Sequence, residues 1–276
     1  MNSKPLALVA VFFPIALMSA LAGFRWQGSP TGVQQTPQPQ GQAARSDSPL
    51  FGGTPQRNMV NTIDKNPPLS WNVADGKLKN VKWVVDLGGS AAYGGPVVAD
   101  GKIYVGTNQK GGTSFEKAVL VAINEADGKV LWKIVHEFPN DEVFAEGKTS
   151  GLCSTPVVEK DRLYYVAPGC EVVCADTNGK VQWKYDMMKE LKVVPHHLAN
   201  CSPLIVGDLV MIVTGNGVDN EGHLVSPKAP SFIAVNKNTG KLVWQSSLPG
   251  EKIIEGQWSN PALAIVDGKK QVIFPG

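Results

Sequence analysis

Short apolar runs, each closed by a turn, recur along the chain from residue 51 onward. In the first full copy, an apolar run after Pro96 ends at an Asp-Gly pair, and further runs lead to a second Asp-Gly pair and then to Trp132. Runs of this kind, separated by Asp-Gly, Gly-Asp or Asn-Gly, predict β-hairpins. The pattern therefore predicts repeated units of four antiparallel strands.

The units keep a regular spacing. We predict that a proline opens each innermost strand and that a tryptophan ends each outermost strand. The prolines are Pro96, Pro156, Pro203 and Pro261, and the tryptophans are Trp83, Trp132, Trp183 and Trp244. Four strands in about 50 residues is the content of one β-propeller blade. We therefore predict an all-β propeller with part of a first blade at about residues 67–87, three complete blades, and a fourth that stops after two strands.

The proline and the tryptophan suit the two edges of such a blade. Proline lacks an amide proton, and the innermost strand tolerates it because that strand is a sheet edge lining the channel. We expect each tryptophan to pack against the neighbouring blade, as large aromatic side chains do in cores of this kind. Their recurrence in every unit favours packing over a ligand role.

The first 22 residues have the pattern of a signal peptide. A positive start is followed by 18 uncharged residues (5–22), and Ala20 and Ala22 supply the small side chains that signal peptidase accepts, so we predict cleavage after Ala22. The alternative is an uncleaved membrane anchor at residues 5–22, although this stretch barely spans a bilayer and Pro14 interrupts it. Either way, we predict export to the periplasm or the extracellular space.

The segment at residues 23–50 is rich in Gln and Pro and poor in large aliphatic residues. Such a segment cannot bury enough apolar surface to offset its chain entropy, so we predict a flexible linker. The predicted propeller domain follows at residues 51–276.

Composition narrows the range of partners. Lys and Arg number 26 and Asp and Glu 24, which gives a net charge of +2. This balance argues against nucleic-acid binding and against polybasic membrane binding, since both need concentrated positive charge. We therefore expect contact with a membrane only through an uncleaved anchor.

The turn-and-tryptophan block has the form of a known repeat. Its copies run from Asn124 to Trp132, from Asp176 to Trp183 and from Asn236 to Trp244, each with Gly-Lys inside. The block resembles the repeat of pyrroloquinoline-quinone (PQQ) propellers, and segments 51–58, 214–217 and 256–261 are similar to exported PQQ-like propellers of the planctomycete type. The resemblance covers residues 51–276. That family contains PQQ-dependent alcohol dehydrogenases, the outer-membrane assembly lipoprotein and many exported proteins without an assigned activity.

The predicted ring is incomplete. PQQ-like propellers usually have seven or eight blades, and this chain supplies about four, with an apolar edge at Val272-Ile273-Phe274. The chain would be a fragment of a longer protein, half of a ring that two chains complete, or an open stack of sheets. We favour the fragment, because a natural C-terminus rarely falls within a blade. We expect the isolated chain to be poorly soluble, or oligomeric through self-association of this edge.

The four cysteines allow one disulfide in an exported protein. Cys153 and Cys201 precede neighbouring innermost strands with opposite parity, which points their side chains toward each other, so a Cys153–Cys201 bridge is one interpretation. Two buried thiols are the alternative. Cys170 and Cys174 lie too far apart along an extended strand for a bridge, and we expect Cys174 to be a small core residue.

The entrances of the innermost strands gather at one mouth of the channel, where propellers bind ligands. The spacing predicts a mixed aromatic and amide lining there, made of Tyr93, Asn200, His197, Asn216, Gln257, Trp258 and Asn260. Such a lining suits a planar or sugar-like ligand or the edge of a peptide. The alternative is that Tyr93 and Trp258 only plug the channel.

The histidines do not predict a metal site. His196 and His197 are adjacent, and adjacent residues on a strand point in opposite directions, so they chelate poorly unless a loop bends them. We expect His136 and His223 to be surface residues.

The resemblance raises the question of catalysis with PQQ and Ca²⁺. The alcohol dehydrogenases of the family carry an adjacent Cys-Cys pair, a Ca²⁺-binding acidic and amide set, and an Asp base. This sequence has no Cys-Cys pair, no Cys-x-x-Cys-His motif and no acidic residue that matches the base. We therefore predict an exported binding or scaffold module, with no catalytic or metal residues, for a small ligand or a protein partner at the channel mouth. Part of a PQQ- and Ca²⁺-dependent alcohol dehydrogenase is the alternative.

Overall fold

The computed structural model describes residues 47–74, 76–88, 93–111, 114–139, 144 and 150–275. At residues 110–111 and 114–116 it describes the backbone alone. The predicted signal peptide (1–22) and most of the predicted linker (23–50) lie outside these ranges. Within them, no helix has the length and apolar character needed to cross a membrane.

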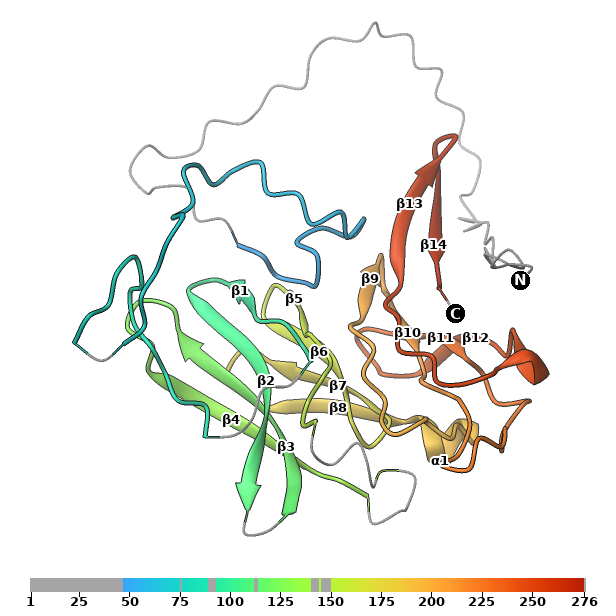
Figure 1. Cartoon of the computed structure of the whole chain (residues 1–276). Coiled ribbons are helices and arrows are strands. Elements are labelled where there is room, and N and C mark those ends of the chain that lie inside the picture. Colours follow the sequence, from blue (N-terminus) through green and yellow to red (C-terminus); the bar gives the residue numbers. More distant parts are fainter. Residues whose placement is uncertain are drawn as a thin grey trace, which may run out of the picture.

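The strands form four antiparallel sheets, each built from consecutive strands (Figure 1). The first sheet holds β1 (Val97–Ala99), β2 (Lys102–Gly111), β3 (Ser114–Asn124) and β4 (Val130–Glu137). The second holds β5 (Val157–Glu159), β6 (Arg162–Ala167), β7 (Glu171–Asp176) and β8 (Val181–Asp186). The third holds β9 (Leu204–Val206), β10 (Leu209–Val213), β11 (Phe232–Asn236) and β12 (Leu242–Ser246), and the fourth β13 (Ala262–Val266) and β14 (Lys269–Ile273). The all-β propeller prediction is confirmed, and the propeller is incomplete.

Helical structure in the described ranges is confined to short turns between sheets. The helix α1 (Met187–Leu191) follows β8, and the side chain of Asp186 caps it by accepting the amide proton of Lys189 at 2.9 Å. A 3₁₀ turn, η3 (Gly250–Lys252), follows β12. Both elements are short; Met187 of α1 is fully buried and joins the core that the second and third sheets share.

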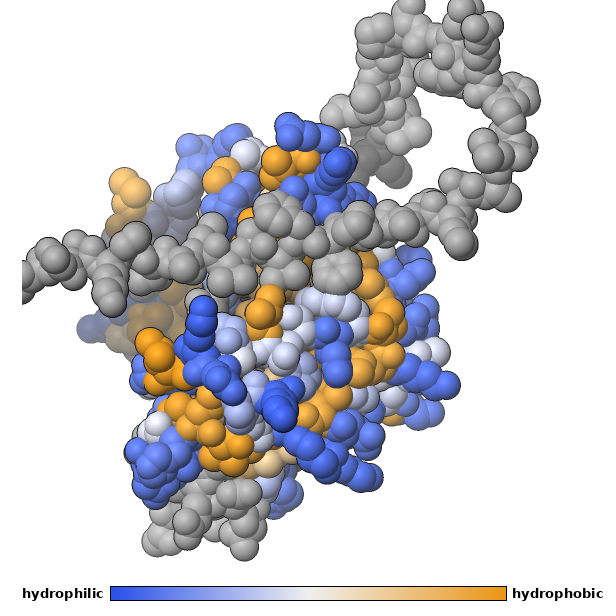
Figure 2. All heavy atoms as spheres, turned by 90° about the vertical axis from the view of Figure 1, so that its right-hand side faces the viewer, coloured by the Kyte–Doolittle hydropathy of each residue, from blue (hydrophilic) through white to orange (hydrophobic). Residues whose placement is uncertain are grey.

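The sheets pack face to face through their apolar central strands. β7 and β11 are almost entirely buried, whereas β8 and β12 alternate between half-buried and exposed side chains. This is the pattern of a blade whose inner strands lie between two neighbours and whose outer strand reaches solvent. On the face of the molecule shown in Figure 2, apolar residues lie in separate patches among hydrophilic ones.

A register shift recurs in the outer strand pair of the three complete sheets. Trp132 pairs with Ala122, Trp183 with Cys174 and Trp244 with Ala234, and the register shifts at the next residue each time. A bulge at this point increases the local twist of the outer strand. The expectation that Cys174 is a small core residue is confirmed, because its side chain is fully buried.

Each of these tryptophans lies at a sheet-to-sheet contact. A Cβ atom on Gly179 would stand 2.8 Å from the ring of Trp132, and one on Gly240 would stand 2.7 Å from the ring of Trp183. The Nε1–H of Trp132 also donates to the carbonyl of Thr177 at 3.1 Å, and Trp183 makes the equivalent bond. Only glycine leaves room for the indole, and the predicted packing between blades is confirmed.

The sheets are also joined at the inner rim, by the residue that precedes each proline. The amide of Gly95 donates to Oγ1 of Thr155 at 2.9 Å, and the amide of Thr155 donates to Oγ of Ser202 at 3.0 Å. The amide of Ser202 in turn donates to Oδ1 of Asn260 at 2.6 Å. Each of these amides thus bonds to the equivalent side chain of the next sheet, which fixes the spacing of the strand entrances.

Residues 48–57 cross the innermost strands of all four sheets. Ser48 forms two backbone hydrogen bonds with Val98, and the carbonyl of Pro49 accepts the amide of Val158. The carbonyl of Pro55 accepts the amide of Leu263. Nη2 of Arg57 donates to the carbonyls of Ser202 and Pro203. Because these contacts involve β1, β5, β13 and the entrance to β9, this segment acts as a strap along the inner rim. The sequence analysis did not foresee this.

One surface prediction is wrong. His136 lies in β4, is only 5% exposed, and shares a hydrogen bond of 2.8 Å between its Nε2 and the hydroxyl of Tyr165 in β6. Strand β4 runs on past Trp132 far enough to face the second sheet, and this extra length was not apparent from the turn pattern.

Candidate functional site

Three aromatic rings form a stack between the entrances of the third and fourth sheets. The rings of His196 and His197 lie 3.8 Å apart between centroids, and the ring of Trp258 lies 5.3 Å from His196. Trp258 and His197 are nearly parallel, with 12° between their planes and 6.2 Å between centroids. Two of the predicted lining residues, His197 and Trp258, are therefore brought together.

The stack depends on a bend at His197. This residue has a φ of 61°, in the left-handed region that few residues other than glycine and asparagine adopt. The bend lets the amide of Leu198 donate to the carbonyl of His196 at 2.7 Å, which closes a tight turn. Neighbouring histidines that would point apart on a strand are consequently stacked.

Hydrogen bonds hold the rings of the stack in place. Nδ1 of His196 donates to the carbonyl of Val218 at 2.7 Å, because a carbonyl oxygen can only accept. The Nε1–H of Trp258 donates to the carbonyl of His196 at 3.2 Å. His196 is buried and Trp258 is 38% exposed, so the indole is the member of the stack that a ligand reaches most easily.

Two glycines make room for this arrangement. A Cβ on Gly256 would stand 2.6 Å from the Trp258 ring and 3.0 Å from Cβ of His196, and a Cβ on Gly217 would stand 2.8 Å from the same His196 atom. Larger residues at either position would displace the rings. The Thr-Gly-Asn-Gly and Gly-Gln-Trp motifs of the sequence are thus explained by close packing around His196.

Asn216 holds the loop that carries the histidines. Its side chain is fully buried, its Oδ1 accepts the amide of Val194 at 3.1 Å, and its Nδ2 donates to the carbonyl of Ser226 at 3.0 Å. Its backbone also pairs with Pro195. Asn216 therefore holds the histidine loop in place through buried hydrogen bonds and is not exposed to a ligand.

Two amide oxygens on the loops that carry the stacked rings have no hydrogen-bond partner among the described residues. They are Oδ1 of Asn200 and Oε1 of Gln257, and both atoms are buried. A buried carbonyl oxygen without a donor costs about 1–3 kcal/mol, so such groups call for an explanation. Both belong to the predicted lining, on the entrance loops that flank the stack.

The remaining lining residues lie elsewhere or serve the fold. Asn260 accepts the amide of Ser202 and so belongs to the inner-rim bonds. Tyr93 is 86% exposed and precedes Gly94, where an added Cβ would stand 2.7 Å from the carbonyl oxygen of Cys153. It takes no part in the described contacts of the stack, which lies between the third and fourth sheets.

All four cysteines are free thiols in the structure. Sγ of Cys153 faces its own loop and donates to the carbonyl of Ser150 at 3.3 Å, whereas Sγ of Cys201 accepts the amide of Val213 in β10 at 3.2 Å. The two sulfurs thus make hydrogen bonds with different segments, and no Cys153–Cys201 bridge is formed in the structure. Burial raises the pKa of Cys201 to about 11 and also raises that of Cys153.

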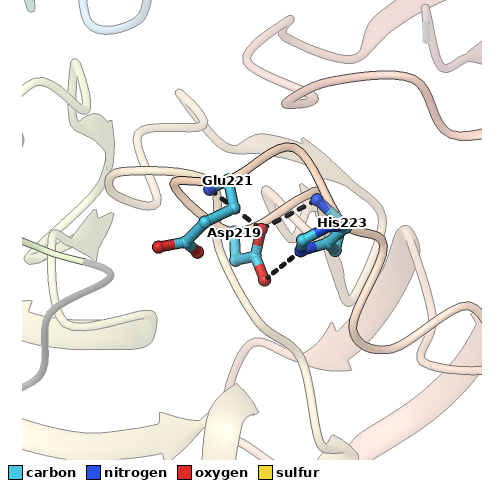
Figure 3. A group of neighbouring side chains, drawn as sticks. All are labelled: Asp219, Glu221 and His223. Carbon is cyan, nitrogen blue, oxygen red and sulfur yellow. Dashed lines mark hydrogen bonds and ion pairs between the residues drawn. The ribbon is translucent and has the colours of Figure 1, made fainter.

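A second group of polar side chains lies on the loop between β10 and β11 (Figure 3). Asp219, Glu221 and His223 each place one ligand atom within 4.8 Å of the others. Oδ1 of Asp219 accepts the amides of Glu221 at 3.1 Å and His223 at 2.8 Å, and its Oδ2 lies 3.5 Å from Nδ1 of His223. The hydrogen bond from the backbone amide of His223 is the main cause of the lowered pKa of Asp219. These contacts close the loop. His223 is exposed, as expected.

Among the described residues, the side chains around the stack do not supply the ligands of a Ca²⁺ site. Ca²⁺ takes six to eight oxygen ligands, with carboxylates prominent among them. The lining offers imidazoles, an indole and amides, and the carboxylates of Asp219 and Glu221 lie on an exposed loop. The donor set instead suits a neutral ligand with hydrogen-bond donors.

Sequence reasoning missed His196, the central ring of the stack. It missed this residue because the prediction expected adjacent histidines to point in opposite directions unless the loop that carries them bends. The close spacing of Gly215, Gly217 and Gly256 was a usable signal, since glycines in facing loops indicate that a bulky group lies between them.

Comparisons with known proteins bear on the fold. Residues 70–274 match the family model described as "Outer membrane protein assembly factor BamB". No curated protein sequence matches the chain. Among solved structures, a europium-containing methanol dehydrogenase is 16% identical with a TM-score of 0.50, over 73% of this chain and 32% of that one. Quinohemoprotein alcohol dehydrogenase from Comamonas testosteroni is 16% identical with a TM-score of 0.49, over 83% and 46%. The chain thus spans less than half of the length of each of these structures.

Proposed function

Because this chain belongs to the PQQ-type propeller family whose model is described as outer membrane protein assembly factor BamB, we propose that it is an exported binding module. The signal-peptide pattern of residues 1–22 supports export, and the outer-membrane role in the family's description is consistent with it. The module recognises its ligand at the stack formed by His196, His197 and Trp258, which we call the aromatic stack.

One observation carries this proposal. The half-exposed Trp258 directly follows Gln257, and the loop of the two histidines leads to Asn200; the side-chain oxygens of Gln257 and Asn200 are buried and have no hydrogen-bond partner among the described residues. An amide oxygen only accepts hydrogen bonds, so the ligand must bring donors. The indole face adds a flat apolar surface, so the ligand combines hydroxyl or amide donors with a flat face. A sugar ring has both features.

A sugar ring fits better than a strand of peptide. An added strand needs unpaired backbone groups along a sheet edge. At this rim the amides of Gly95, Thr155 and Ser202 are already bonded to neighbouring sheets. The side chains around the stack are the groups left for recognition.

Calorimetric titration of the purified protein with disaccharides of glucose, galactose and N-acetylglucosamine tests the proposal. At least one sugar should bind, and Trp258→Ala should weaken its binding at least tenfold, because it removes the stacking face. Ile254→Ala, an exposed residue of the same loop, should leave the affinity unchanged. Binding of an extended peptide alone, or sugar binding that survives Trp258→Ala, would contradict the proposal.

A further inference from the structure

Arg57 lies at the C-terminal end of the strap and is held there by a tight turn. Its amide donates to the carbonyl of Thr54 at 2.8 Å, and its φ of 55° lies in the left-handed region. A Cβ on Gly52 would stand 2.8 Å from Cα of Arg57, so the chain folds back closely here and only glycine fits at residue 52. The backbone of Arg57 is therefore fixed beside the entrance to β9.

Only one nitrogen of the Arg57 guanidinium has hydrogen-bond partners among the described residues. Nη2 donates to the carbonyl of Ser202 at 2.8 Å and to that of Pro203 at 2.9 Å. A guanidinium has five N–H protons, and these bonds use two of them. The other protons, on Nε and Nη1, find no acceptor in the part of the chain that the structure describes, and both nitrogens are buried.

The guanidinium also lacks a counter-charge among the described groups. Burial lowers the pKa of Arg57, and of these groups only Cys201 acts against that shift. Burial raises the pKa of the Cys201 thiol to about 11, so this thiol is uncharged at neutral pH. The ring of Phe51, whose centroid lies 5.4 Å from Cζ of Arg57, adds a cation–π contact but no formal charge.

Arg162 at the start of β6 shows the usual arrangement. Its Nη1 is also buried without a hydrogen-bond partner among the described residues. In the sheet, however, Arg162 lies directly opposite Glu159 of β5 and Asp176 of β7, so two carboxylates flank its charge. Arg57 has no carboxylate in an equivalent position within the described ranges.

A buried cation without a counter-charge calls for an explanation. Charged side chains are almost never buried unpaired, because removing an ion from water costs several kcal/mol. The two carbonyls and the Phe51 ring offset part of this cost, but none of them carries a negative charge. Orphaned buried donors of this kind indicate a bound molecule that supplies acceptors.

We infer that the guanidinium of Arg57 binds a small monovalent anion of the carboxylate class at the inner rim, beside the entrance to β9. Arginine donates charge-assisted hydrogen bonds to carboxylate oxygens. The protons on Nε and Nη1 are the available donors, and one negative charge balances the one positive charge. A bound water would accept the same protons but would leave the charge unbalanced.

The surroundings of Arg57 favour a small anion. Nε and Nη1 are closed to solvent, whereas Arg57 as a whole is half-buried and its neighbours Gln56 and Asn58 are exposed. A local movement of this end of the strap would admit formate or acetate. A larger ligand would also have to break the bond between Leu263 and Pro55. A divalent anion such as sulfate brings a second charge that Arg57 does not balance, and its desolvation costs more.

This site is separate from the aromatic stack. The hydrogen bonds and the ring contact of Arg57 involve none of the three stacked rings. The inference therefore does not depend on the proposed sugar ligand, and the sugar titration leaves it unaffected.

Thermal unfolding of the full chain in rising concentrations of sodium formate is the first test. A ligand that binds only the folded protein raises the unfolding midpoint as its concentration rises. The rise should be equal in the wild type and in Lys65→Gln, which removes an exposed positive charge, and smaller by a factor of roughly three or more in Arg57→Gln. The difference between the wild type and Arg57→Gln removes the general effect of salt. No rise, equal rises in all three proteins, or a larger difference in sulfate than in formate would overturn the inference.

Hydrogen exchange of the wild type keeps the inference testable if Arg57→Gln does not fold. The amide of Leu263 donates to Pro55 in the strap, so an anion that holds Arg57 in place should slow its exchange. We expect slowing by a factor of roughly three or more in formate relative to sulfate of the same ionic strength. The amide of Asn236, which bonds to Lys241 outside the strap, should exchange equally in both salts. Equal exchange of Leu263 in the two salts, or equal slowing of both amides, contradicts the inference.

Discussion

His136 in the first sheet and Tyr165 in the second share a buried hydrogen bond of 2.8 Å between the imidazole Nε2 and the phenol oxygen. The rings meet edge to face with centroids 5.5 Å apart. Burial, helped by the charge of Lys184, lowers the pKa of His136 from 6.5 to about 4. A contact that joins two blades therefore depends on a neutral histidine.

This contact predicts a pH-dependent stability. Between pH 6.5 and 4 the unfolded chain binds a proton at residue 136 and the folded chain does not, so stability is complete above pH 6.5 and falls as the pH drops. The loss should approach ~3 kcal/mol, at about 1.4 kcal/mol per pKa unit. Urea unfolding of the wild type and His136→Gln at pH 7 and pH 4.5 measures it. The variant should lose less stability than the wild type over this interval, and parallel pH profiles would contradict the prediction.

Replacing a glycine that packs against a tryptophan ring should loosen the stack of sheets. Gly179→Ala places a Cβ 2.8 Å from the Trp132 ring and forces alanine to a φ of 90°. We expect a loss of roughly 2–4 kcal/mol in the free energy of unfolding, from strain and displaced packing. Gly207→Ala has a φ of 62° and open space, so it should cost about 1 kcal/mol from the backbone alone. Denaturant unfolding compares the two, and equal losses would show that the indole contact adds nothing.

The side-chain oxygen of Gln257 predicts that one substitution affects folding stability and ligand affinity in opposite directions. Gln257→Leu removes a buried oxygen that has no donor among the described residues, so the free protein should be as stable as the wild type or more stable by up to about 1 kcal/mol. Binding of the sugar found by calorimetry should weaken at least fivefold. Thermal unfolding and titration test both parts. A variant that is destabilised and binds normally would give Oε1 a purely structural role.

The thiols should resist modification in the folded protein. Burial raises the pKa of Cys174 and of Cys201 to about 11, and raises that of Cys170 well above its ordinary value. At pH 8 only a fraction on the order of 0.001 of such a thiol is the reactive thiolate. Iodoacetamide should label the native protein slowly and all four cysteines after denaturation, as counted by mass spectrometry. Two labelled cysteines in denatured, unreduced protein would instead reveal a disulfide.

Export makes a separate prediction about the N-terminus. Expression of the full sequence in a bacterium should yield a mature protein that begins at Gly23, because cleavage is predicted after Ala22. Ala20→Asp with Ala22→Asp should block processing, since signal peptidase requires small residues there. N-terminal sequencing of the periplasmic fraction measures this. Recovery of the unprocessed wild-type chain in the membrane fraction would favour the anchor.

Sequence pattern and structure agree where a local rule decides the outcome. The Asp-Gly pairs, the prolines and the tryptophans predict the strand order, because two-residue turns and edge prolines each permit few geometries. The position of Trp132 over Gly179 follows from the same repeat.

Long-range contacts were not predictable in this way. The αL bend at His197, which stacks the two histidines, depends on the bonds of His196 to Val218 and Trp258. These residues come from separate loops, and the glycines that mark their close packing do not say which side chains meet there. The burial of His136 and the path of residues 48–57 were missed for the same reason.

The strap at residues 48–57 has a consequence for how the molecule matures. Its partners range from Val98 to Leu263, so this early part of the domain completes its contacts only after the fourth sheet has been synthesised. Contacts between such distant positions close slowly, because the loop entropy is lost before they form. The strap therefore forms late in folding, and until it does, the inner rim of the four sheets lacks the hydrogen bonds that residues 48–57 supply.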